Sequence, residues 1–135
     1  MQRYTFLEHT ADARVLVEAS SHEELFKCAL HALTELQGAT NYVGDELQFE
    51  VCCNARDTTK LLIDFLSYAL TLSHIHTLIF DRVDIFFLDN NTIKATLFGR
   101  KAKHFQKDVK AVTYHEAEIL KTESGTYQTM IIFDI

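Results

Sequence analysis

The sequence has 135 residues, of which 47% are hydrophobic and 24% are charged, and its formal net charge is -6. This length and composition predict one domain over residues 1–135 that buries roughly two-thirds of its unfolded surface. So acidic a chain has few cations with which to displace counterions from phosphates, which argues against stable independent binding of nucleic acid. No apolar run reaches the roughly 18 residues of a membrane span, and the N-terminus lacks the apolar core of a signal peptide. We therefore expect a cytoplasmic protein without a membrane anchor.

Two short strands and a helix are predicted for the first part of the chain. Apolar and polar residues alternate over residues 3–8 and 13–19, so these runs either pair as a hairpin or form one bent strand. Ser21 and Glu24 then have the spacing of a capping box, which predicts the start of a helix. Apolar residues follow at three- and four-residue steps, and Gly38 supplies a left-handed end.

A strand and a second helix are predicted next. Residues 46–54 alternate strictly between apolar and polar side chains, which indicates a half-buried strand. Asp57, Thr58 or Thr59 can cap the helix that follows, because each has a side-chain oxygen that accepts from a main-chain amide. This helix carries a broad apolar face and loses its pattern around residues 73–76.

The last part of the chain predicts strands over residues 78–88, 92–98, 110–121 and 127–135, with a polar connector over residues 99–109. Asparagine, aspartate and glycine between the strands of each pair indicate hairpins. Strands that pair through hairpins, with only two helices to cover them, predict an α+β fold. We expect two helices packed on a largely antiparallel sheet in a single compact domain.

The sequence lacks the common nucleotide-binding motifs and the cysteine spacings of metal sites. The glycines form neither a GxGxxG motif nor a Walker A loop, so any nucleotide chemistry must be supplied by a partner. Cys28, Cys52 and Cys53 have no metal-binding spacing, and we interpret them as free thiols, with Cys28 and Cys53 at apolar positions of their elements.

Carboxylates near the two ends of the chain are candidates for a metal site. Asp12 closes the segment HTAD (residues 9–12), where it either forms a local Asx turn or binds a metal. Asp134 is followed by Ile135, whose α-carboxylate places two negative groups one residue apart. Such a pair is costly to bury unless a cation compensates, and Ca²⁺ and Mg²⁺ prefer carboxylate oxygens. The alternative is a solvated strand end.

Two further segments carry candidate functional residues. Thr113 and His115 lie two apart on a predicted strand and either line a pocket or simply favour β-structure. Residues 100–110 hold five of the 13 basic residues, which form either a positive patch or a solvated connector. Asp64 is expected to be solvated at the edge of the apolar face of the second helix.

Four segments together resemble the archease family. They are residues 6–12 (FLEHTAD), 64–66 (DFL), 110–115 (KAVTYH) and 133–135 (FDI). The resemblance spans residues 3–135, with the motifs in the family's order. The family has an apolar residue and a glycine after HTAD, whereas this chain has Ala13 and Arg14.

The resemblance implies an accessory protein of RtcB-type RNA ligases. Such proteins promote guanylylation of the ligase and its multiple turnover in tRNA splicing or RNA repair, while the ligase engages GTP and RNA. The family's divalent metal, Ca²⁺ or Mg²⁺, would be bound here by Asp12, Asp134 and the terminal carboxylate of Ile135. His9, Lys110 and His115 would contact the ligase or its nucleotide.

Two other functions remain open from the residues alone. One is a small metal-dependent phosphoester hydrolase or nuclease that uses Asp12, Asp134, His9 and His115. The other is an RNA-binding module that uses the basic residues between 100 and 110, although the net acidity of the chain disfavours it.

Overall fold

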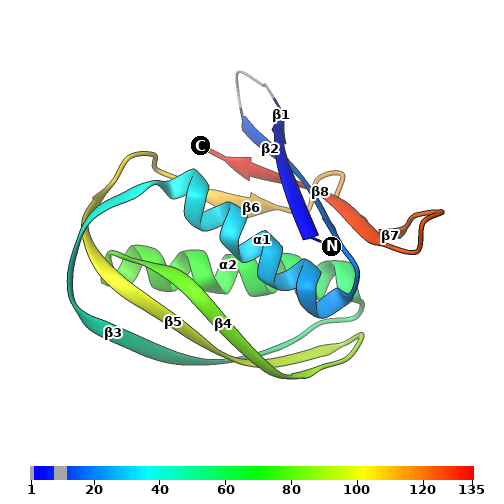
Figure 1. The fold of residues 1–135 in the computed structure, drawn as a ribbon, viewed down its shortest axis with the longest axis horizontal. Coiled ribbons are helices and arrows are strands. Elements are labelled where there is room, and N and C mark those ends of the chain that lie inside the picture. The colour runs from blue at the N-terminus through cyan, green and yellow to red at the C-terminus, as the bar shows by residue number, and fades with distance from the viewer. Residues whose placement is uncertain (1, 8–11) are drawn as a thin grey trace.

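Two β-sheets enclose two helices in the computed structural model, which describes residues 2–7 and 12–135, with the backbone alone over residues 39–43 (Figure 1). In chain order the elements are β1 (Gln2–Leu7), β2 (Asp12–Ala19), α1 (His22–Gln37), β3 (Ala39–Asn54), α2 (Thr58–His76), β4 (Leu78–Leu88), β5 (Thr92–Phe105), β6 (Ala111–Thr113), β7 (Leu120–Lys121) and β8 (Tyr127–Asp134). This arrangement confirms the predicted α+β fold.

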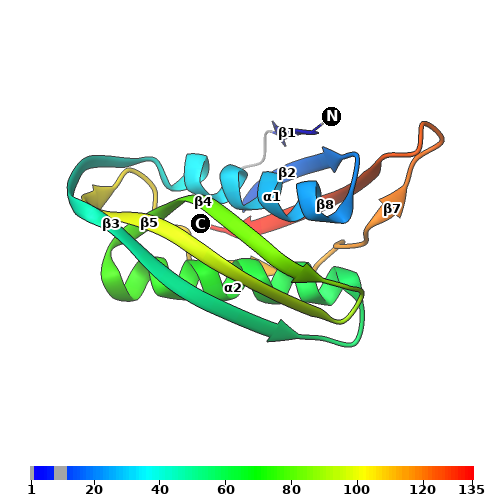
Figure 2. The ribbon, with the colours of Figure 1, turned by 60° about the horizontal axis from the view of Figure 1, so that its bottom comes forward.

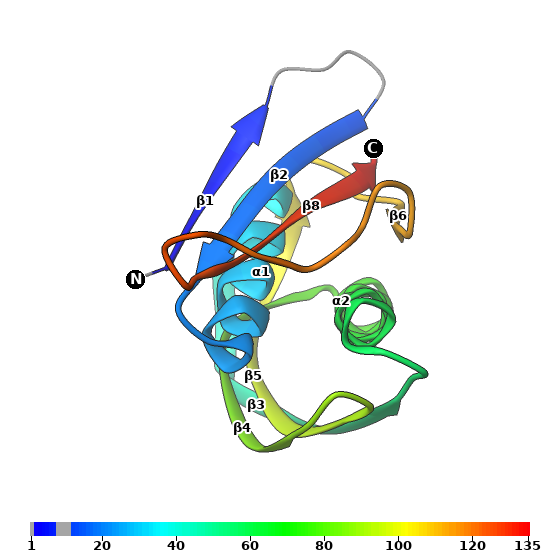
Figure 3. The same cartoon turned by 90° about the vertical axis from the view of Figure 1, so that its right-hand side faces the viewer.

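Within the described residues, every strand pairing is antiparallel. One sheet has the order β1-β2-β8-β6, with β7 also paired to β8, and the other has the order β3-β5-β4. Figures 2 and 3 show the helices between the two sheets. Since β1 pairs with β2, the hairpin alternative is correct and the bent strand is not. The last strand, β8, lies in the middle of its sheet, next to β2.

Both helices begin at residues that the sequence predicts. The Ser21 hydroxyl accepts a hydrogen bond from the Glu24 amide at 3.1 Å, and Gly38 ends α1 with a φ of 59°. The Asp57 carboxylate accepts from the Lys60 amide at 2.8 Å at the start of α2. In the described part of the chain, neither helix is long and apolar enough to cross a membrane.

The core lies between the sheets and is built from the apolar faces of both helices. Phe26 of α1 and Phe65 of α2 are fully buried, and their ring centroids lie 5.7 Å apart. Burying a side chain of this size contributes roughly 1.5–3 kcal/mol. Cys28 is buried in the same cluster, as predicted, and burial raises the pKa of its thiol to about 11.

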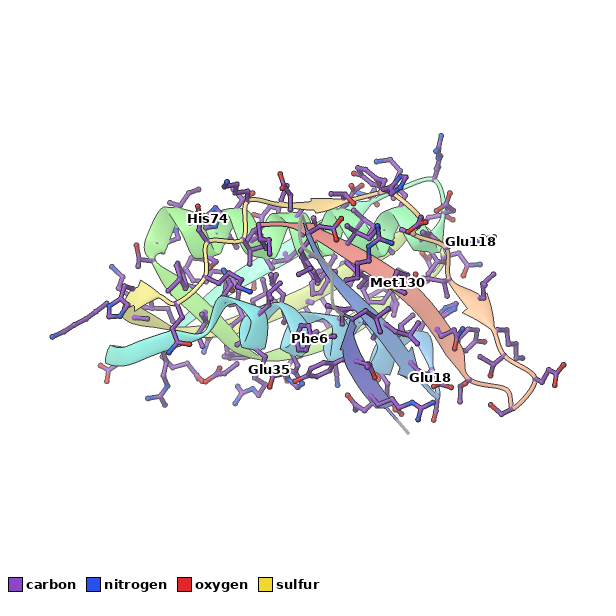
Figure 4. The ribbon with its side chains drawn as sticks, turned by 90° about the horizontal axis from the view of Figure 1, so that it is seen from above. Phe6, Glu18, Glu35, His74, Glu118 and Met130 are labelled. Atoms are coloured by element: carbon purple, nitrogen blue, oxygen red, sulfur yellow. The ribbon has the colours of Figure 1, made fainter. Side chains whose placement is uncertain are left out.

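The five-stranded sheet has an inner face toward the helices and an outer face. On β2, Val15 and Val17 are fully buried on the inner face. Because side chains alternate along a strand, Asp12 and Arg14 lie on the outer face. Figure 4 looks onto this outer face, where Met130 is labelled on β8. The fold therefore presents the first polar residues of β2 away from the core.

The pairing of β3 with β5 is longer than the sequence predicts. β3 begins at Ala39 rather than at residue 46, and β5 continues to Phe105. The predicted polar connector over residues 99–109 is therefore wrong for its first half. Main-chain pairing explains the difference: Lys101 is paired on both sides of β5 and keeps its side chain exposed, while Ala102 is buried.

The single strand predicted over residues 110–121 is also wrong. Within this segment only the short strands β6 and β7 pair with β8, and the chain turns between them. The Ala117 amide donates to the Tyr114 carbonyl at 3.1 Å, and Glu116 has a φ of 60°. A left-handed conformation costs a non-glycine residue roughly 1–2 kcal/mol, so a turn is not expected at a glutamate from the sequence.

Candidate functional site

Asp12 and Asp134 lie directly opposite each other on neighbouring strands. The antiparallel register of β2 and β8 pairs these two residues, so their side chains share the outer face of the sheet. Cβ atoms of residues paired in this way are about 4.5–5.5 Å apart. Figure 3 shows the C-terminal end of β8 beside the start of β2. The structure thus brings together two carboxylates from opposite ends of the chain.

Lys110 joins this corner through its main chain. Its amide donates to the Asp134 carbonyl at 2.7 Å, and the next residue, Ala111, is paired with Asp134 in the sheet. The Lys110 side chain is exposed. The segments around Asp12, Lys110 and Asp134 therefore meet at one end of the five-stranded sheet.

A cavity of about 250 Å³ opens between the strands at this corner. It is lined by Asp12, Thr113, His115, Ile132 and Asp134. The Thr113 hydroxyl is buried and has no hydrogen-bond partner among the residues that the structure describes. An unpartnered buried hydroxyl costs roughly 1–3 kcal/mol, so the cavity favours a water molecule or a ligand oxygen beside Thr113.

Ile135 lies on the other side of Asp12. It lines a larger open cavity of about 790 Å³, whose walls include Asp12, Arg14, Phe6, Leu36 and Lys107. Asp12 contributes to both cavities, whereas Asp134 lines only the smaller and Ile135 only the larger. The three predicted metal ligands are therefore neighbours around Asp12 rather than the walls of one pocket.

The donors at this corner fit a hard divalent cation. Across residues 2–7 and 12–135, no three His, Cys, Asp or Glu side chains are grouped to hold a metal. The candidate set has two side-chain carboxylates, Asp12 and Asp134, and takes its third donor from the main-chain carboxylate of Ile135. All three are oxygen donors, which Ca²⁺ and Mg²⁺ prefer over nitrogen or sulfur.

An arginine already contacts one member of this carboxylate pair, Asp12. Arg14 Nε lies 3.3 Å from Asp12 Oδ1, and Arg14 Nη1 lies 3.1 Å from Glu116 Oε2. The Arg14 and Asp12 side chains are 27% and 21% exposed, so the ion pair is only partly screened by water. No sequence pattern indicated the contact between Arg14 and Glu116, because Glu116 is distant in the chain and lies in a turn that was not predicted.

Of the two candidate histidines, the structure describes only His115. His115 follows β6 in the turn rather than lying on a strand, yet it lines the smaller cavity together with Thr113, as one of the two interpretations of the sequence had it. Its side chain is exposed. His9 lies outside the residues that the structure describes.

A second polar cluster connects the turn after β6 to α2. The Tyr114 hydroxyl donates to the Asp64 carboxylate, which also accepts from Lys60 Nζ at 3.2 Å. The hydrogen bond to Asp64 is the main cause that raises the pKa of Tyr114. The expectation that Asp64 is solvated is therefore wrong, because its carboxylate accepts hydrogen bonds from Tyr114 and Lys60. The four-residue spacing of Lys60 and Asp64 was the available signal for their ion pair.

The basic residues between 100 and 110 do not all lie near Asp12, Asp134 and Ile135, which we call the carboxylate corner. Arg100, Lys101 and Lys103 are exposed on β5, in the three-stranded sheet, and Arg100 Nε lies 3.9 Å from Asp81. Lys107 alone among the described residues of this run lines a cavity with Asp12. The run is thus divided between the two sheets.

Comparison with known proteins gives consistent matches over the whole chain. The Archease protein family (MTH1598/TM1083) matches residues 4–135. The protein archease of Methanosarcina mazei is 31% identical over 142 residues, which cover 99% of this chain and 97% of that protein.

Two solved structures share the fold. Protein 1598 of Methanobacterium thermoautotrophicum is 27% identical with a TM-score of 0.71, over 98% of both chains. An archease from Thermotoga maritima, described as a possible chaperone, is 24% identical with a TM-score of 0.71, over 96% of this chain and 94% of that one. On the family match and the relative in Methanosarcina mazei, the chain belongs to the archease family.

Proposed function

We propose that this protein is a non-catalytic activator of an RtcB-type RNA ligase. In this role it promotes guanylylation of the ligase and its repeated turnover in tRNA splicing or RNA repair, in the cytoplasm. Membership of the archease family supports an accessory role. The observation that carries the proposal is the pairing of Asp12 with Asp134, with the Lys110 amide bonded to Asp134, because it joins three of the family-like segments at one corner.

We further propose that Asp12, Asp134 and the terminal carboxylate of Ile135 bind Ca²⁺ or Mg²⁺. When bound, the cation would neutralise the facing carboxylates and add positive charge to an acidic corner. The Asp12 and Asp134 side chains would orient the corner, since both are fixed by the register of β2 and β8. The unpartnered Thr113 hydroxyl supports a ligand oxygen or water nearby.

Lys110 and His115 are the proposed contacts with the ligase or with its bound nucleotide. Both side chains are exposed, and both flank β6 next to the carboxylate corner. His9 is proposed for the same role from its place in the HTAD segment. A lysine ammonium is a compact point charge that pairs well with a phosphate or a carboxylate. GTP, RNA and the catalytic metal would all belong to the ligase.

The chain itself is expected to bind no RNA stably. Its net charge of -6 disfavours contact with a phosphate backbone, and its exposed lysines are spread over two sheets. RNA would therefore reach the complex through the ligase.

RNA joining by the cognate ligase tests the proposal. The ligase is given GTP and an excess of RNA ends, with or without this protein, and joined product is counted per ligase molecule. We expect the wild-type protein to raise the yield well above one joining event per ligase. Asp12→Ala, Lys110→Ala and a chain extended by one glycine after Ile135 should each reduce it, whereas Lys103→Ala, a matched lysine on the other sheet, should not.

Two results would contradict the proposal. One is an unchanged yield with the wild-type protein and its cognate ligase. The other is steady hydrolysis of a model phosphoester by the protein alone, lost in Asp12→Ala, which would establish the hydrolase alternative instead.

A further inference from the structure

Arg14 places a positive charge beside Asp12, one of the proposed metal ligands. Its Nε lies 3.3 Å from Asp12 Oδ1, within the range of an ion pair. A divalent cation bound to the same carboxylate would approach the same oxygens and would be repelled by the guanidinium. Arg14 and a metal at Asp12 therefore oppose each other electrostatically.

A second contact holds Arg14 in this position. Its Nη1 lies 3.1 Å from Glu116 Oε2, in the turn after β6. In the sheet, β8 separates β2 from β6, so the Arg14 side chain has to cross β8 to reach Glu116. Ile132, the residue of β8 paired with Arg14, is only 3% exposed. The guanidinium thus contacts a carboxylate on each side of β8, Asp12 through Nε and Glu116 through Nη1.

Glu116 gives Arg14 a second carboxylate partner besides Asp12. If a cation takes Asp12, the guanidinium keeps its contact with Glu116 and stays charge-paired. Without a cation, the same arginine offsets the charge that Asp12 adds opposite Asp134. The corner is compensated in both conditions, with different partners for Asp12.

We propose that Arg14 is a tethered cation that competes with the divalent metal for Asp12 and so lowers the metal affinity of this chain. This inference rests on the metal site of the proposed function. The arginine makes metal binding weaker and more readily reversible, and it leaves the metal-free protein with its carboxylates partly neutralised.

Calcium titration calorimetry on the full chain tests the competition. The wild-type protein is compared with Arg14→Met, which keeps a long apolar side chain over β8 but removes the charge, and with Arg14→Lys, which keeps the charge. We expect Arg14→Met to bind Ca²⁺ with a Kd about tenfold lower, equivalent to about 1.4 kcal/mol. The Kd of Arg14→Lys should stay within about threefold of the wild-type value, or about 0.7 kcal/mol. Thermal unfolding by circular dichroism verifies that both variants are folded.

Arg3 provides the matched control. It lies on the same sheet and forms an ion pair with Glu18 at 2.8 Å, away from Asp12. Arg3→Met removes one positive charge from the chain, as Arg14→Met does, and should leave the Kd for Ca²⁺ unchanged within about twofold because distant exposed charges are screened. If Arg3→Met and Arg14→Met lowered the Kd for Ca²⁺ equally, the effect would come from net charge alone, and the proposed competition at Asp12 would be wrong.

A second readout follows Arg14 directly. In ¹⁵N-labelled wild-type protein, the Nε–H resonance of Arg14 should move on addition of Ca²⁺ as its contact with Asp12 is replaced. The Nε–H resonance of Arg3, bonded to Glu18 at 2.9 Å, should stay in place. An Arg14 resonance that does not move while Ca²⁺ binds would overturn the inference.

The possible failures are distinguishable. If the wild-type protein and Arg14→Met bind Ca²⁺ equally, the competition is wrong and the metal site stands. If neither binds Ca²⁺ or Mg²⁺, both the competition and the metal site are wrong. Activation of the ligase is measured separately by RNA joining and is not decided by either result.

Discussion

Replacing Asp134 by asparagine should affect stability in opposite directions without and with Ca²⁺. In the wild-type protein Asp134 faces Asp12 across the β2–β8 pair, so two like charges lie opposite each other. Asparagine keeps the size of the side chain and removes one charge. Without a metal the variant should therefore be slightly more stable than the wild type, whereas with Ca²⁺ it should be less stable, because it loses one of the proposed metal ligands.

The magnitudes follow from the pairing and the chain length. A like-charged pair directly opposite costs roughly 0.2–1 kcal/mol, and Arg14 beside Asp12 favours the lower half of this range. For 135 residues the unfolding entropy is about 0.28 kcal/mol/K, so Tm should rise by about 1–2 °C in EDTA. At a Ca²⁺ concentration of about 100 times Kd, binding should stabilise the wild type by about 2.7 kcal/mol, or about 10 °C.

Thermal unfolding followed by circular dichroism, in EDTA and in Ca²⁺, measures both effects. Asp84→Asn is the matched control: it removes an aspartate that is 64% exposed on β4, in the other sheet, and should not change the response to Ca²⁺. A wild-type Tm that does not rise with Ca²⁺ would contradict the proposed metal site. A Tm that falls by several degrees in Asp134→Asn in EDTA would contradict repulsion between the two carboxylates, since it would mean a stabilising role for the Asp134 carboxylate without any metal.

Three other changes test separate parts of the structure. Tyr114→Phe removes the hydrogen bond to Asp64 and should lower the free energy of unfolding by about 1 kcal/mol in urea titrations; no change would mean that this bond is not formed in solution. The hydrogen bond from Thr126 is the main cause that lowers the pKa of Glu18 below its ordinary 4.5. Its stabilising effect is full above that pH and lost as pH falls through the lowered pKa, so Thr126→Val should lower Tm at pH 7 but progressively less below about pH 4. A pH-independent loss would contradict this. Gly99→Ala would place a Cβ 2.5 Å from a β4 carbonyl oxygen and should reduce stability by about 2 kcal/mol or more, whereas a neutral result in urea would show that β4 yields easily.

The helix boundaries were predictable because local chemistry determines them. Ser21 with Glu24, Gly38 and Asp57 act within a few residues of their own positions, and the structure uses each as the sequence predicts. The alternation of residues 46–54 likewise gave the correct exposed face of β3, since the period of two does not depend on the partner strand.

The strand ends were less predictable because they depend on partners distant in sequence. β5 continues to Phe105 because β3 pairs with it along this whole stretch, while β4 pairs with it as far as Lys101. The turn at Glu116 interrupts a run of good strand formers, and its ion pair with Arg14 joins two remote segments.

The carboxylate corner was predictable in its residues but not in its geometry. Asp134 was notable from the sequence because it ends an apolar strand beside a terminal carboxylate. Its position opposite Asp12 follows only from the register of β2 and β8, which no local pattern in either strand specifies. The contribution of Arg14 could not be predicted for the same reason.

The most direct measurement for the proposed activation is the rate at which the cognate RtcB-type ligase becomes guanylylated. Purified ligase is mixed with labelled GTP, and covalent ligase–GMP is followed over time with and without an equimolar amount of this protein. We expect faster formation of ligase–GMP with the wild-type protein and little acceleration with Asp12→Ala that is verified to be folded. An identical rate with and without the wild-type protein would mean that this protein does not activate the ligase.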